Sequence, residues 1–133
     1  MIPLFVDSFY FFAILNPNDA AHSKAIEYST HHSAPLVTTS WIMTEVADGL
    51  ARSGHRGVFR QLVSHFRAVA SNEFVAADDE LFEQGIELND ERSDKQWSLT
   101  DCISFVVMKQ RDILDALTGD HHYEQAGFTA LLK

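Results

Sequence analysis

Short apolar segments alternate with longer amphipathic ones along the chain, and this alternation leaves few folds open. Segments that suit buried strands span residues 3–6, 35–38, 74–76, 113–117 and 128–132. Between them lie stretches of helical periodicity, such as residues 58–69, where Phe59, Leu62 and Phe66 recur at helical spacing. Strands joined by helical crossovers predict a mostly parallel five-stranded sheet with helices on both faces. The expected fold is therefore a three-layer α/β/α domain over residues 1–133.

Polar residues at segment boundaries predict where the helices begin and end. A short helix is expected over residues 9–15, and residues 52–54 should end a later one. Residues 89–95 read as a polar loop. Side chains that can accept a hydrogen bond from a free backbone N–H are favoured at the first position of a helix. The residues expected to fill that role are Asn18, Ser40, Asp78 and Ser98.

Composition excludes several classes of protein. The formal net charge of -9 argues against nucleic-acid binding by bulk charge alone, because that binding needs cations against phosphates. Cys102 is the only cysteine, which excludes an intrachain disulfide and a cysteine zinc site and suits a reducing cytosol. The apolar start is interrupted by Asp7, lacks signal-peptide features and is too short to span a bilayer. We expect a cytoplasmic protein with no membrane contact.

Four acidic residues occupy positions that converge in a parallel sheet. Asp7 directly follows the first predicted strand and Asp120 the fourth, while Glu45 and Asp101 lie in the early turns of two helices. Ligands of such sheets bind at the carboxyl ends of the strands. Clustered carboxylates repel one another unless a cation lies between them, and magnesium and manganese prefer carboxylate oxygens. The sequence therefore predicts a magnesium or manganese site.

Each acid also has a purely structural interpretation. Ser98 and Asp101 fit a capping box, in which the acid bonds back to the first residue of its own helix. Asp7 can cap the helix that follows it, Glu45 can be a solvated helix residue, and Asp120 can belong to a turn. Taken one at a time, none of the four is specific for metal binding.

Several neighbouring side chains allow two interpretations. The hydroxyls of Ser8 and Thr118 can orient a metal ligand or contact phosphate, or they can cap a helix or turn. His121 and His122 can bind phosphate or move a proton, although an ordinary surface position for at least one is favoured. Trp97 can stack on a base or pack at a helix entry.

A basic stretch offers a place for RNA despite the negative total charge. Residues 49–72 contain no acid but hold four arginines, whose spacings of four, four and seven allow a shared helix face. An ordinary solvated face is the alternative. Lys95, which precedes the Asp101 helix, can approach the acids. The predicted RNA-contacting residues are Arg52, Arg56, Arg60, Arg67 and Lys95.

The combined pattern carries a family resemblance. The chain contains, in order, LFVDSF, SWIMTEVADGL, SLTDCISFVVMKQRDI and ALTGDHHYEQAGF. This order resembles the PIN domain family of metal-dependent ribonucleases, many of which are toxins of VapBC-type toxin–antitoxin pairs, over nearly the whole chain. Asp115 departs from the pattern, because a less polar residue is usual inside the fourth strand. The residues that match the family's acids are Asp7, Glu45, Asp101 and Asp120.

The resemblance implies a function and its partners. It implies a divalent-metal-dependent endoribonuclease with an acidic metal pocket, an RNA substrate, an antitoxin protein and a homodimer. The apolar FYFFAIL run at residues 9–15 also favours a dimer, because it offers more apolar surface than one short helix usually buries. Receiver domains are disfavoured because they need an acidic pair after the first strand, and Asp7 stands alone beside Ser8. Dehalogenase-type phosphatases are disfavoured because they need Asp-x-Asp, and Phe9 stands where the second acid would be. A non-catalytic interaction module on the same fold remains the alternative, and divalent-metal binding separates the two.

Overall fold

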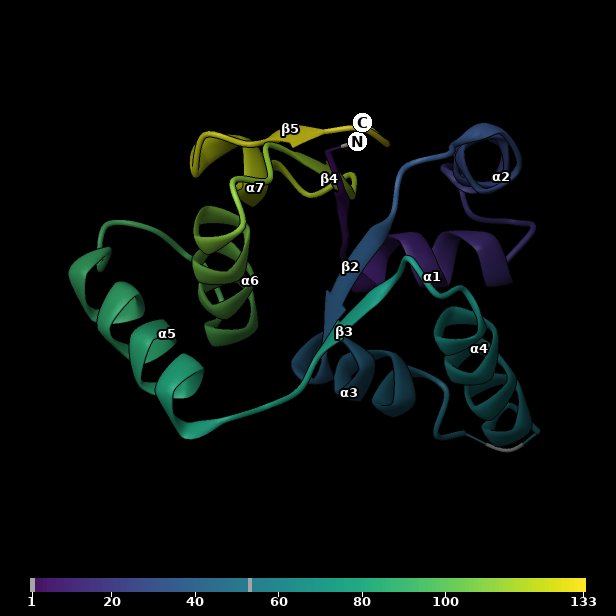
Figure 1. The fold of residues 1–133 in the computed structure, drawn as a ribbon, viewed down its shortest axis with the longest axis horizontal. Coiled ribbons are helices and arrows are strands. Elements are labelled where there is room, and N and C mark those ends of the chain that lie inside the picture. Colours follow the sequence, from purple (N-terminus) through teal and green to yellow (C-terminus); the bar gives the residue numbers. More distant parts are fainter. Residues whose placement is uncertain (1, 53) are drawn as a thin grey trace.

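The computed structural model describes residues 2–52 and 54–133, and five strands within them form one parallel sheet (Figure 1). The order across the sheet is β3-β2-β1-β4-β5, and every neighbouring pair is parallel. The expected α/β fold with a five-stranded parallel sheet is confirmed. The strands are β1 (Leu4–Val6), β2 (Leu36–Thr39), β3 (Glu73–Val75), β4 (Asp115–Leu117) and β5 (Thr129–Ala130).

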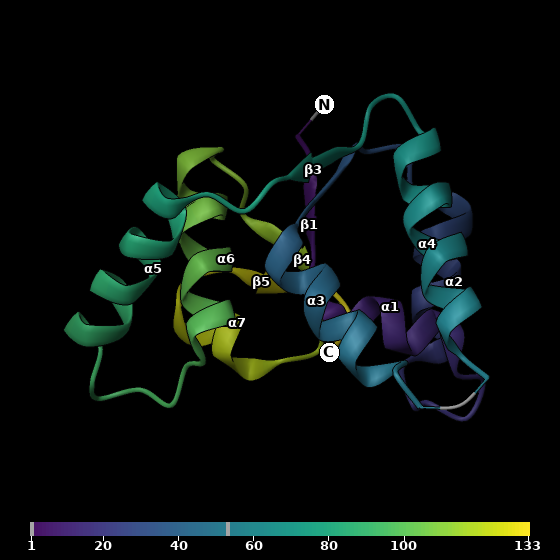
Figure 2. The ribbon, with the colours of Figure 1, turned by 90° about the horizontal axis from the view of Figure 1, so that it is seen from below.

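Helices form a layer on each side of the sheet, as Figure 2 shows. One layer contains α1 (Ser8–Leu15), α2 (His22–His31) and α4 (Arg56–Ala68). The other contains α5 (Asp79–Glu91), α6 (Leu99–Gln110) and α7 (His121–Gln125). Helix α3 (Ser40–Gly49) follows β2 directly, at the carboxyl end of that strand. No helix in the described ranges is long and apolar enough to cross a bilayer.

Two of the predicted helix starts are wrong. Thr39 rather than Ser40 caps α3, because the Thr39 hydroxyl accepts the Ile42 N–H at 3.1 Å. Ser40 is the first helical residue, and its hydroxyl accepts the Ala77 N–H instead. Helix α2 begins at His22, well after the predicted cap at Asn18, because residues 16–21 form tight turns. In these turns the side chains of residues 16 and 19 accept backbone N–H groups two residues further on.

The remaining boundaries largely follow the sequence. Asp78 caps α5 through a 2.7 Å bond from the Leu81 N–H, and Ser98 caps α6, as predicted. Helix α5 continues to Glu91, so residues 89–91 are helical where a loop was expected. The helix break predicted at residues 52–54 follows α3, although Ser53 lies outside the described residues. Asp115 is the first residue of β4, a strand end that accommodates a half-buried polar side chain.

The hydrophobic core takes up most of the FYFFAIL run. Tyr10, Phe11 and Ala13 are buried, and Phe9, Phe12 and Ile14 pack against the core from partly buried positions. The aromatic rings of this helix are therefore largely explained by the interior of one chain. Little apolar surface of residues 9–15 is therefore left exposed to favour a homodimer. The expectation of a dimer depends mainly on the family resemblance.

The sheet has a switch point between β1 and β4. Strands β2 and β3 extend the sheet on one side of β1, and β4 and β5 extend it on the other. Sheets of this kind bind ligands at the carboxyl ends of the strands where the order reverses. Val6 is in register with Leu117, so the residues that follow, Asp7 and Thr118, emerge side by side. The first and fourth predicted acids thus come from the two strands at this point.

Candidate metal centre

Asp7 is buried at the centre of the site. Its side chain is 6% exposed, and the Thr118 hydroxyl donates to its Oδ2 at 2.7 Å. Asp7 occupies the capping position of α1, but its side chain makes no capping hydrogen bond, so a simple helix cap is the wrong interpretation. Burial raises the pKa of Asp7 from 3.8 to about 6, opposed by the Thr118 bond and assisted by the charges of Asp101 and Glu45.

Glu45 reaches the same place from α3. It is half-buried, and Ser8 at the start of α1 donates a hydrogen bond to its Oε1 at 3.0 Å. Burial raises the pKa of Glu45, and the charges of Asp101 and Asp120 raise it further, while the Ser8 bond lowers it. A solvated helix residue would have neither the partner nor the acidic neighbours. Ser8 therefore orients an acid of the cluster.

Asp101 serves as a helix cap and as a member of the acidic cluster. The Ser98 hydroxyl accepts the Asp101 N–H at 3.0 Å, and Asp101 Oδ2 accepts the Ser98 N–H at 3.3 Å, which completes the predicted capping box. The same oxygen lies 3.2 Å from His122 Nδ1. Burial raises the pKa of Asp101, and the Asp120 charge adds to this, against lowering by the Ser98 N–H and by His122. The hydrogen bonds of the cap therefore do not fully offset the cost of the buried Asp101 charge.

Asp120 completes the group from the loop after β4. Its Oδ1 accepts the His122 N–H at 2.9 Å as the cap of α7, and its own N–H donates to the Thr118 hydroxyl at 3.1 Å. Its carboxylate raises the pKa of both Glu45 and Asp101. Thr118 therefore ties Asp120 to Asp7, and the structure brings all four predicted acids into one electrostatic neighbourhood.

The side chains of this cluster fit a hard divalent cation. Three buried or half-buried carboxyls have raised pKa values, because each is removed from water and faces further negative charge. A cation among them would reverse that effect, and oxygen donors from several carboxylates are what magnesium and manganese bind. The ordered hydroxyl donors already hold individual carboxylate oxygens in place. Their role as metal ligands stays a prediction.

The double role of Asp101 leads to a test by Asp101→Asn. In EDTA we expect the variant to melt at or above the wild type, because the substitution removes a charge that burial and Asp120 disfavour, and asparagine can still accept the Ser98 N–H. Added magnesium should then stabilise it less than the wild type. The measurement is a pair of melting curves, in EDTA and in millimolar magnesium. Asp78→Asn, which alters the α5 cap, is the control and should keep the full magnesium shift.

Sequence reasoning left the two histidines and Trp97 open and missed Tyr123 altogether. His122 is half-buried against Asp101, whereas His121 is exposed, so only the latter has the surface position that the sequence favoured. The Tyr123 hydroxyl is fully buried near Asp7 and Asp101, whose charges raise its pKa together with the larger effect of burial. Trp97 is buried and packs edge-on against Phe105, with ring centroids 5.0 Å apart, so its ring is not exposed for stacking on a base.

The predicted basic face is only partly formed. Helix α4 begins at Arg56, so Arg52 lies outside it and cannot share its face. Arg56, Arg60 and Arg67 line one groove of about 490 Å³ between α3 and α4. The Arg67 guanidinium lies 4.9 Å from the centroid of the Phe74 ring, which leaves two exposed arginines free of that stacking. Ala47 of α3 also lines the groove, so the groove adjoins the helix that carries Glu45.

Lys95 lies in the loop that leads into α6. It is half-buried, and the pKa of the exposed Asp94 beside it is lowered mainly by the hydrogen bond from Arg92, with a smaller lowering by the charge of Lys95. Its backbone N–H donates to the Arg92 carbonyl oxygen at 3.0 Å, so Lys95 is part of the turn before Ser98.

Comparisons with known proteins find that the chain is similar to a nuclease. No family model matches the chain. The 23S rRNA-specific endonuclease VapC20 of Mycobacterium tuberculosis, in strains H37Rv and CDC 1551, is 29% identical over 126 residues, which cover 94% of this chain and 95% of the relative. The crystal structure of M. tuberculosis VapC20, described as a sarcin-ricin loop cleaving toxin, matches with a TM-score of 0.84 at 23% identity, over 95% of this chain and 96% of that one. The structural match shows a shared fold along almost the whole length.

Proposed function

We propose that this chain is a PIN-domain protein related to VapC20, and that it is a divalent-metal-dependent endoribonuclease that hydrolyses RNA phosphodiester bonds. The observation that carries the proposal is the acidic cluster at the switch point. Its members come from four separate parts of the chain, and the pKa values of three of them, Asp7, Glu45 and Asp101, are raised by burial and by the charges of the others. Such repulsion has no structural benefit without a cation. The proposed ligands are Asp7, Glu45, Asp101 and Asp120.

The chain's own side chains would hold these ligands in place. Thr118 restrains Asp7 through Oδ2, and Ser8 restrains Glu45 through Oε1. Asp101 is restrained through Oδ2 by the Ser98 N–H and by His122. Fixed carboxylates lose little freedom when an ion binds, which favours affinity and a defined geometry. When bound there, magnesium or manganese would supply Lewis-acid activation of water and neutralise charge on the phosphate that is attacked.

The RNA would approach along α4. Arg56 and Arg60 are exposed in the groove beside α3, and cationic side chains at that position can hold phosphates on either side of the bond to be cut. The acidic residues of α5 are on the opposite helical layer (Figure 2), so the local field beside α4 is more positive than the total charge suggests. The substrate of VapC20, 23S rRNA, is the first RNA to test.

Partners and location follow from the same family relation. We propose that the chain is the toxin of a toxin–antitoxin pair, that it binds a cognate antitoxin protein, and that it works in the cytoplasm. A homodimer is part of the proposal. An apolar groove of about 530 Å³, lined by residues of α1, α2 and α4, offers surface for protein contact on the layer that carries the basic groove.

The decisive experiment measures RNA cleavage against metal. We expect 23S rRNA to be cut with magnesium or manganese and to stay intact in EDTA, because the carboxylates need a cation both to bind phosphate and to activate water. Restoring magnesium after EDTA should restore cleavage. Full cleavage in EDTA would contradict the proposal. Magnesium binding without cleavage of any RNA would instead favour the non-catalytic interaction module.

A further inference from the structure

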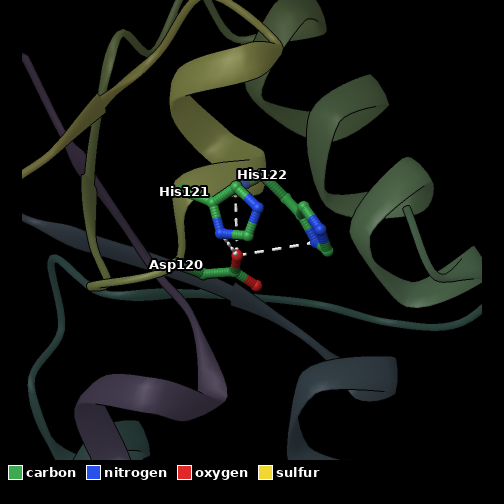
Figure 3. A group of neighbouring side chains, drawn as sticks. All are labelled: Asp120, His121 and His122. Carbon is green, nitrogen blue, oxygen red and sulfur yellow. Dashed lines mark hydrogen bonds and ion pairs between the residues drawn. The ribbon is translucent and has the colours of Figure 1, made fainter. Parts of the chain in front are cut away.

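Two adjacent histidines face one carboxylate oxygen at the edge of the acidic cluster (Figure 3). The Nδ1 atom of His121 lies 3.7 Å from Asp120 Oδ1, and the Nδ1 atom of His122 lies 3.5 Å from the same oxygen. The two imidazole rings are close together, with centroids 4.4 Å apart. Three potential ligand atoms, one from each residue, all lie within 4.8 Å of one another.

These separations suit a metal ion better than direct hydrogen bonds. A good N–H···O bond is about 2.7–3.2 Å long. Two ligand atoms bound tetrahedrally at about 2.0–2.2 Å are roughly 3.4 Å apart. The distances from Asp120 Oδ1 to the two nitrogens, 3.5 and 3.7 Å, lie close to the second value. The ligand atoms of the two histidines lie within 4.8 Å of each other, and rotation of the exposed His121 side chain is the movement that would shorten this separation.

We propose that Asp120, His121 and His122 form a binding site for a borderline transition-metal ion of the zinc type. Imidazole nitrogen is a ligand that zinc, cobalt and nickel accept readily, whereas magnesium prefers oxygen donors. Two histidines and one carboxylate also leave a coordination position open, as in catalytic zinc sites. The site shares Asp120 with the carboxylate cluster, but its two imidazole nitrogens give it a different metal preference.

An ion can reach the site from solvent, and neighbouring groups hold Asp120 and His122 in place. The side chain of His121 is 62% exposed and that of Asp120 is 30% exposed, so an ion can enter from solvent. His122 is held at 21% exposure beside Asp101, whose Oδ2 lies 3.2 Å from its Nδ1, so an ion bound by that nitrogen would replace the shared proton and lie next to the Asp101 carboxylate. The backbone N–H of His122 also donates to Asp120 Oδ1, which fixes the turn that carries both rings. The site is thus partly organised before any ion binds.

A second histidine pair provides a matched control. His31 and His32 are also adjacent in sequence, at the end of α2, and His32 Nδ1 lies 3.0 Å from the Ala34 carbonyl oxygen. Within the described residues, they belong to no cluster of three ligating side chains. Replacing them removes the same chemical groups from the chain without changing the proposed site.

The experiment measures zinc binding without RNA, so its outcome is separate from that of the proposed nuclease activity. Zinc affinity is determined by competition with a chromophoric chelator in millimolar magnesium, and cobalt is added as a spectroscopic probe. The wild type should bind one zinc ion per chain at this site and give the visible spectrum of cobalt with nitrogen ligands. His121→Gln should weaken zinc binding at least about 10-fold and remove the spectrum. The double variant His31→Gln/His32→Gln should match the wild type.

Two results would overturn the site. One is a zinc affinity in His121→Gln equal to that of the wild type. The other is an equal loss in the His31→Gln/His32→Gln control, which would place the binding elsewhere. Because His121 is exposed, its replacement should leave the fold intact, and a melting curve in EDTA checks this.

Discussion

Asp7→Asn is expected to abolish RNA cleavage and to stabilise the metal-free protein by up to about 3 kcal/mol at pH 8. The loss of cleavage follows because the substitution removes the most buried acid of the cluster. The gain in stability has a separate cause. A rise in the pKa of a carboxyl from 3.8 to about 6 means that the folded chain tolerates its charge less well than the unfolded chain does. Asparagine carries no charge and can still accept the Thr118 hydrogen bond.

The stability difference between Asp7→Asn and the wild type should depend on pH. Below pH 3.8 the Asp7 carboxyl is protonated in both states, so the wild type and the variant should differ little in stability. As pH rises towards 6, the unfolded chain releases the proton first and the wild type loses stability relative to the variant. Above about pH 6 the difference should be complete and constant.

Urea unfolding in EDTA at pH 4 and pH 8, beside a cleavage assay in magnesium, measures both effects. Asp19→Asn is a suitable control, because Asp19 caps a turn through the Ala21 N–H and is not among the charges that act on the cluster. It should leave cleavage unchanged. Equal stability of Asp7→Asn and wild type at pH 8 would show that the charge of Asp7 is not disfavoured. Cleavage that survives the substitution would remove Asp7 from the site.

Charge reversal on α4 is the second large effect. Arg56→Glu/Arg60→Glu should weaken RNA binding roughly 10-fold or more at low salt, because two cationic contacts become repulsive. The slope of log affinity against log salt should fall by about one unit per lost phosphate contact. Binding titrations at several salt concentrations measure both. The melting temperature should change little, since both side chains are exposed.

The control for this prediction matches the change in total charge. Lys24→Glu/Lys109→Glu alters two exposed lysines on α2 and α6 by the same amount. If both double variants weaken RNA binding equally, net charge explains the loss and the α4 groove has no special role. If the slope of log affinity against log salt is unchanged in the arginine variant, the arginines of α4 form an ordinary solvated face.

The sequence predicted the layers of this fold because its apolar periods are unambiguous. Parallel strands place whatever follows them at a common edge, so Asp7 and Asp120 could be assigned to one region from their positions alone. Cap residues were harder, since Thr39 and Ser40 are both good candidates. The deciding factor is that Thr39 still pairs with Val75 as the last residue of β2, so Thr39 is the cap and Ser40 is the first helical residue.

The contacts that organise the site could not be read from local patterns. The Thr118–Asp7 hydrogen bond joins residues 111 positions apart, and the Ser8–Glu45 bond joins residues 37 positions apart. The contact between His122 and Asp101 depends on how α7 lies against α6. Such pairings are fixed by packing of whole elements, which sequence periodicity describes only coarsely. The arginine groove shows the same limit, because the start of α4 at Arg56 excluded Arg52.

The hydrogen bond from Thr118 to Asp7 has a consequence for biosynthesis. On the ribosome the chain emerges from its amino end, and β1, α1 and α3 are made long before β4 and α7. A nascent chain that ends before β4 lacks Thr118 and Asp120, and so has three of the four acids and no hydrogen bond that holds Asp7 in place. If the cluster cuts ribosomal RNA, as proposed, a translating ribosome is not exposed to the activity of its own product until β4 and α7 have been synthesised and have docked.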